Sequence, residues 1–97
     1  MALATATELD FVSLADALEL VLLLLDNEPR RYARAALRWH GRYCSDLRPD
    51  LPEALAVLSL LGALQGGRPK PAAHALAELL HQRELLRASE ALIRWAS

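Results

Sequence analysis

The sequence predicts an all-α protein, a compact bundle of about five short helices. Leu, Ala and Arg, which all favour helices, account for 23, 18 and 10 of the 97 residues. The residues that favour strands are scarce, with three Val, one Ile and five aromatic side chains. The chain is 54% apolar with a net charge of −1, the reverse of a disordered composition. We therefore expect one domain over residues 1–97, with residues 1–12 as a looser N-terminal segment.

The first two helices are delimited by capping residues and proline. Ser13 is a suitable N-cap for a helix over residues 14–26, because its hydroxyl can accept a hydrogen bond from the first turn. Asn27 and Glu28 precede Pro29, which starts a second helix over residues 28–47. This helix should end before Pro49, whose ring disfavours helical geometry in the residue ahead of it.

The second half of the chain predicts three more helices. Asp50 caps a helix over residues 52–65, Gly66 and Gly67 end it, and residues 66–71 form a loop. The last 26 residues contain two apolar stripes at helical spacing that are out of phase with each other. The first stripe is Ala72, Ala73, Leu76, Leu79 and Leu80, and the second is Leu86, Ser89, Leu92, Ile93 and Ala96. A turn near residues 81–83 is needed to bring both stripes to one core.

Charge is distributed unevenly along the chain. Residues 1–28 contain six acidic residues and no basic one, whereas residues 29–48 contain six arginines and one aspartate. Five of these arginines form a stripe on the second helix: Arg30, Arg31, Arg34, Arg38 and Arg42. Like charges four residues apart repel each other, so the stripe needs counter-charges. We expect at least two of Arg31, Arg34, Arg38 and Arg42 to lie within salt-bridge distance of carboxylates, with the acids of the first helix or of a second subunit as the preferred partners.

An alternative is that the arginine stripe binds nucleic-acid phosphates. Guanidinium groups suit phosphate geometry, and Trp39 and Tyr43 beside the stripe could stack on bases. The isoelectric point near 6.3 argues against a dedicated nucleic-acid-binding protein. The apolar and aromatic residues on the face opposite the arginine stripe predict instead that Trp39 is buried beside Tyr32 and Tyr43.

The sequence offers little for catalysis or metal binding. His40 and Cys44 lie one helical turn apart, which is half of a zinc site, but no second pair of ligands accompanies them. We interpret them as a core histidine beside a small buried thiol. His74, Glu78 and His81 share an outer face that is better explained as solvated. We expect no enzymatic activity, no cofactor and no metal.

The same features predict a cytoplasmic location away from membranes. Residues 1–10 lack the basic residues of a signal peptide, and the longest apolar run, residues 20–25, is far shorter than a membrane span. The single cysteine, Cys44, cannot form an internal disulfide.

Residues 31–43, Arg-Tyr-Ala-Arg-Ala-Ala-Leu-Arg-Trp-His-Gly-Arg-Tyr, together with the Leu- and Ala-rich helices after them, resemble small all-helical proteins of high-GC bacteria. Residues 75–91 are similar in rhythm to the paired helices of repeat and death-like adaptor domains. These resemblances imply a helical fold and no particular activity.

Surplus apolar residues predict self-association, most simply as a dimer. In the first helix, Leu20, Leu23 and Leu24 fall outside the core stripe, and in the third helix Leu55 and Leu60 do so. Soluble monomers rarely expose apolar patches of several hundred Å². We therefore expect one of these two groups of leucines to lie in a subunit interface or in a contact with another protein.

Overall fold

The computed structural model describes residues 12–97 and confirms the all-α class. Five helices run through this part of the chain: α2 (Leu14–Asn27), α3 (Pro29–Leu47), α4 (Leu51–Ala63), α5 (Pro69–Gln82) and α6 (Leu86–Ala96). Residues 12–97 contain no strand. The prediction for a loose segment over residues 1–12 falls almost entirely outside this range.

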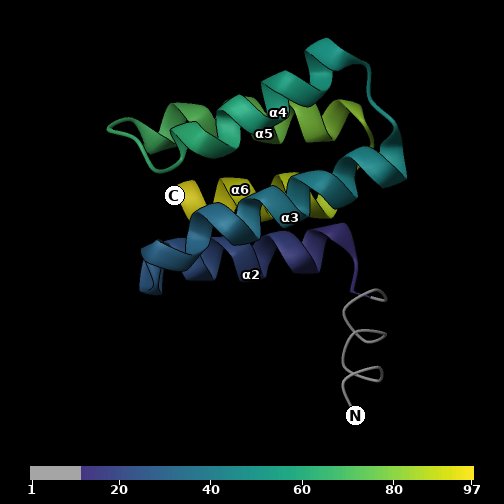
Figure 1. Cartoon of the computed structure of the whole chain (residues 1–97). Helices are drawn as coiled ribbons and strands as arrows, with labels where there is room; N and C mark the ends of the chain where they lie inside the picture. The colour runs from purple at the N-terminus through teal and green to yellow at the C-terminus, as the bar shows by residue number, and fades with distance from the viewer. Residues whose placement is uncertain (1–11) are drawn as a thin grey trace.

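The five helices form a closed ring in which each helix packs against the next and α6 packs against α2 (Figure 1). Successive helices alternate in direction, as the single-residue link between α2 and α3 illustrates. Because the number of helices is odd, the closing pair is parallel. Asp16 and Asp26 near the two ends of α2 accordingly contact Arg87 and Trp95 near the two ends of α6.

The core fills the centre of the ring, and α3 contributes its largest side chains. Tyr32 and Tyr43 are fully buried, and Trp39 is only 3% exposed, as the sequence predicts. The rings of Trp39 and Tyr43 stack with centroids 5.5 Å apart. Two of these buried side chains form hydrogen bonds to the backbone of other helices. Trp39 Nε1 donates to the Leu14 carbonyl of α2 at 2.9 Å, and Tyr32 Oη donates to the Leu61 carbonyl of α4 at 2.7 Å.

The predicted caps are present at both helices that have them. The Ser13 hydroxyl accepts from the Asp16 amide at 3.1 Å, and the Asp50 carboxylate accepts from the Glu53 amide at 2.9 Å. These bonds satisfy amides of the first turn that have no partner within the helix.

Four details differ from the sequence prediction. Helix α4 ends at Ala63 rather than at residue 65. Helix α5 begins at Pro69, inside the expected loop over residues 66–71, because the first turn of a helix tolerates proline. The turn between α5 and α6 lies at residues 83–85, two residues later than expected. Leu86 and Ile93 of the second stripe are exposed. They lie at the edge of α6, whose buried face consists mostly of small residues that allow close packing against α2 and α5.

Candidate interaction surface

Helix α2 packs against α3 on one side and α6 on the other, and no other helix within residues 12–97 covers its third side. Two predicted interface leucines lie on this side: Leu20 is 53% exposed and Leu23 is 55% exposed. Leu24 is half-buried. These three residues, called the α2 ridge below, line a shallow hollow of about 370 Å³ together with Asn27 and Glu28.

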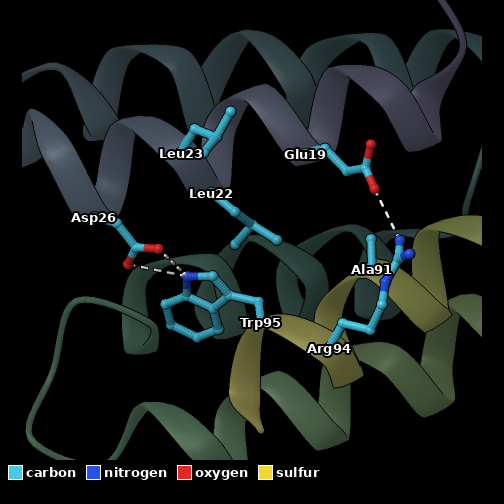
Figure 2. A pocket seen from close by; sticks show the side chains of 7 residues that line it. All are labelled: Glu19, Leu22, Leu23, Asp26, Ala91, Arg94 and Trp95. Carbon is cyan, nitrogen blue, oxygen red and sulfur yellow. Dashed lines mark hydrogen bonds and ion pairs between the residues drawn. The ribbon is translucent and has the colours of Figure 1, made fainter.

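A groove of about 360 Å³ runs beside the α2 ridge, between α2 and α6 (Figure 2). Leu22, Leu23, Ala91 and Trp95 supply its apolar surface. Leu23 lines both this groove and the hollow beside it, so the ridge and the groove form one continuous surface.

Polar bridges between α2 and α6 close both ends of the groove (Figure 2). Trp95 Nε1 donates to the carboxylate of Asp26, with both oxygens at 3.0 Å. Arg94 Nη2 donates to Glu19 Oε1 at 2.8 Å. A third bridge, from Arg87 Nη2 to Asp16 Oδ1, also measures 2.8 Å. These bridges fix the width of the groove by holding the two helices in register.

The same bridges overturn one part of the charge prediction. The acids of α2 were expected to neutralise the arginines of α3, but Asp16, Glu19 and Asp26 bind α6 instead. The sequence does not point to Trp95 as a lining residue of this groove, because its partner Asp26 is 69 residues away and no local pattern connects them.

The arginine stripe has local partners at its two ends. Arg31 Nη1 lies 3.6 Å from Glu28 Oε2, and Arg42 Nε lies 3.4 Å from Asp46 Oδ2. The expectation that at least two of the four arginines lie near carboxylates is thus confirmed, with partners on the same helix or at its cap. Within residues 12–97, no carboxylate lies within salt-bridge distance of the other members of the stripe, Arg30, Arg34 and Arg38.

A polar hollow of about 290 Å³ lies where the stripe faces α2. Its lining, called the arginine hollow below, consists of Leu24, Arg30, Arg31, Arg34, Ala35 and Arg38. Leu24 lines both this hollow and the one beside the α2 ridge. The apolar ridge therefore has the groove on one side and concentrated positive charge on the other.

The second predicted leucine group is divided by the structure. Leu55 is 55% exposed and shares the outer side of α4 with Leu51 and Leu58. Leu60, however, is half-buried and packs against the core, because it lies on the side of α4 that turns toward the ring. The prediction that Leu60 lies outside the core, on surplus apolar surface, is therefore wrong.

The residues considered for metal binding or for base stacking instead make contacts within the fold. The His40 ring nitrogen Nε2 lies 2.8 Å from the Ala54 carbonyl, and Cys44 Sγ lies 3.8 Å from the same nitrogen. No group of three potential metal ligands occurs within residues 12–97. Trp39 and Tyr43 are buried, so they cannot stack on bases as the nucleic-acid alternative supposed.

One polar network links α3, α4 and the turn before α6. Tyr43 Oη donates to Glu53 Oε2 at 2.5 Å, and Arg83 Nε lies 3.0 Å from the same oxygen without the alignment of a hydrogen bond. Arg83 Nη2 donates to the Leu47 carbonyl at 2.7 Å. Burial, and secondarily the bond to Glu53, raises the pKa of Tyr43 to about 12. The network therefore joins α3, α4 and the turn before α6.

Comparison with protein-family models, curated protein sequences and solved structures finds no match to this chain. None of the helices within residues 12–97 has the length and apolar character that crossing a membrane requires.

Proposed function

We propose that this chain is a non-enzymatic helical interaction module that binds a second copy of itself through the α2 ridge. The observation that carries this proposal is the exposure of Leu20 and Leu23, each more than half accessible to water. Burying apolar surface yields about 25 cal/mol per Å², so a partner that covers these side chains gains free energy from their removal from water.

The shape of the surface supports a second copy as the partner. Two-fold dimers require a self-complementary patch, in which a projection on one subunit fits a depression on the other. The α2 ridge is the projection, and the groove lined by Trp95 is the depression beside it. A two-fold axis parallel to α2 and between the two features would place the ridge of each copy in the groove of the other.

The polar bridges support the same arrangement. Trp95 and Asp26 satisfy each other, as do Arg94 and Glu19, so covering the groove would leave these groups hydrogen-bonded. An interface core of apolar side chains with satisfied polar groups at its rim is typical of protein–protein contacts.

The exposed side of α4 is the second candidate for the same function. Leu51, Leu55 and Leu58 follow one another along the helix, and Leu51 is 70% exposed. The α2 ridge has in addition a groove and a hollow beside its leucines, and this shape gives the stronger reason to expect self-recognition there.

Molar mass in solution tests the proposal, measured by light scattering and by sedimentation at micromolar concentration. We expect the parent chain to have twice the 10.7 kDa of one subunit. The double variant Leu20→Glu, Leu23→Glu should be monomeric with unchanged helical content, because both side chains are exposed. The matched control Leu51→Glu, Leu55→Glu alters two exposed leucines on α4 and should remain a dimer.

Two results would contradict the proposal. A parent chain that remains a soluble 10.7 kDa monomer excludes self-association as its function. A dimer that the α4 variant dissociates, while the α2 variant does not, would place the interface on α4.

A further inference from the structure

The arginine hollow has features that self-association through the α2 ridge does not explain. Four arginines line one depression, and within residues 12–97 three of them have no carboxylate within salt-bridge distance. The ion pair that the fourth, Arg31, makes with Glu28 is 3.6 Å long and largely exposed to solvent. Such a pair contributes little, about 0–1 kcal/mol, so it does not neutralise the hollow.

The three arginines that lack a carboxylate partner among residues 12–97 are regularly spaced. Arg30, Arg34 and Arg38 are each four residues apart on α3, which corresponds to steps of about 6 Å and a row of about 12 Å along the helix. They repel one another in this arrangement, and the fold does not relieve the repulsion with acids from α2. A linear polymer with regularly spaced negative charges would relieve it at each position.

Phosphate groups fit this row better than isolated carboxylates. A guanidinium group binds phosphate through two parallel hydrogen bonds, and a phosphodiester backbone presents one such charge per nucleotide. The nearest aromatic side chains of α3, Trp39 and Tyr43, are buried, so α3 offers no stacking platform for bases.

We propose that the arginine hollow binds the phosphodiester backbone of a nucleic acid without reading its sequence, with Arg30, Arg34 and Arg38 as the contacting residues. The isoelectric point near 6.3 describes the whole chain, whereas the positive charge of the hollow is local. The three described acids of α2 that offset the arginines in the net charge are bound to α6, on the other side of that helix.

Fluorescence anisotropy with a labelled single-stranded oligonucleotide, and separately with the duplex, tests the proposal at 50 and 200 mM salt. Three phosphate contacts predict a loss of affinity of roughly 20-fold for the single strand and 40-fold for the duplex over this range. The variant Arg34→Gln, Arg38→Gln should lose about two thirds of this salt dependence. The matched control Arg68→Gln, Lys70→Gln changes the net charge equally on residues outside the hollow and should bind as the parent does.

Several outcomes would overturn the assignment. One is the absence of binding to both oligonucleotides at 50 mM salt. A second is a loss of affinity in the control variant as large as that in the Arg34→Gln, Arg38→Gln variant. A third is that poly-glutamate or inorganic tripolyphosphate, at the same charge concentration, displaces the labelled oligonucleotide as well as unlabelled oligonucleotide does. The variant Leu20→Ser, Leu23→Ser separates this proposal from self-association. It should lose the dimer and keep oligonucleotide binding, so either proposal can fail without the other.

Discussion

Replacing Trp39 with alanine should destabilise the fold more than almost any other single substitution. The side chain is 3% exposed, stacks on Tyr43 and donates a hydrogen bond to the Leu14 carbonyl, so it holds α3 against the start of α2. Truncating a buried tryptophan costs about 3–5 kcal/mol through lost burial and the cavity that remains. In a domain of this size, 1 kcal/mol corresponds to about 4–8 °C in melting temperature. We therefore expect a decrease of at least about 12 °C.

Urea and thermal unfolding followed by circular dichroism measure this change at a fixed protein concentration. Trp39→Phe should be intermediate, because it keeps an aromatic ring but loses the indole N–H, whose hydrogen bond contributes about 1 kcal/mol. Leu37→Ala is the matched control on the same helix, because Leu37 is 58% exposed, and its effect should stay within about 0.5 kcal/mol. If Trp39→Ala melts with the Leu37→Ala variant, the assignment of Trp39 to the core is refuted.

Three further predictions concern pH, a helix cap and the backbone. Burial raises the pKa of Tyr32 and of Tyr43 to about 12 from an ordinary value of 10, so the stability that their neutral forms contribute is complete below pH 10 and is lost as the pH rises through 12. Urea titrations between pH 8 and 12 should show this loss, and Tyr32→Phe should weaken it. An unchanged pH profile in that variant would contradict the burial argument. Ser13→Ala should cost about 0.5–2 kcal/mol, measured by urea unfolding, because it removes the cap of α2; a neutral effect would show that water replaces the hydroxyl. Glu84 has a φ of 63°, so Glu84→Gly should raise the melting temperature by removing about 1 kcal/mol of left-handed strain, and a decrease would contradict this reasoning.

Local signals in the sequence predict most of the fold. The caps Ser13 and Asp50, the prolines and the change of phase between the last two apolar stripes locate the five helices of residues 12–97 to within about three residues. The left-handed residues Arg48 and Glu84 have no such signal, because neither position carries the glycine that usually marks this conformation.

Less of the candidate surface could be predicted from the sequence. The outward position of Leu20 and Leu23 follows from helical spacing, but Leu60 was misplaced because the direction of α4 in the ring decides which of its sides is covered. The groove could not be foreseen at all. It requires α6 to lie beside α2, and the polar bridges between these two helices join residues 69 to 75 positions apart.

Closure of the ring has a consequence for folding kinetics. Helical proteins usually fold fast because their contacts are local, and the hairpins α2–α3 and α5–α6 are of this kind. The seam between α2 and α6 instead joins residues 71 and 75 positions apart in its two ion pairs, and the entropic cost of loop closure rises with that separation. We therefore expect the contacts between α2 and α6 to form last during folding. The backbone amide hydrogens of α6 should accordingly be less protected from exchange than those of α3. The groove exists only after this final step, so the surface proposed to bind a second copy is completed at the end of the folding reaction.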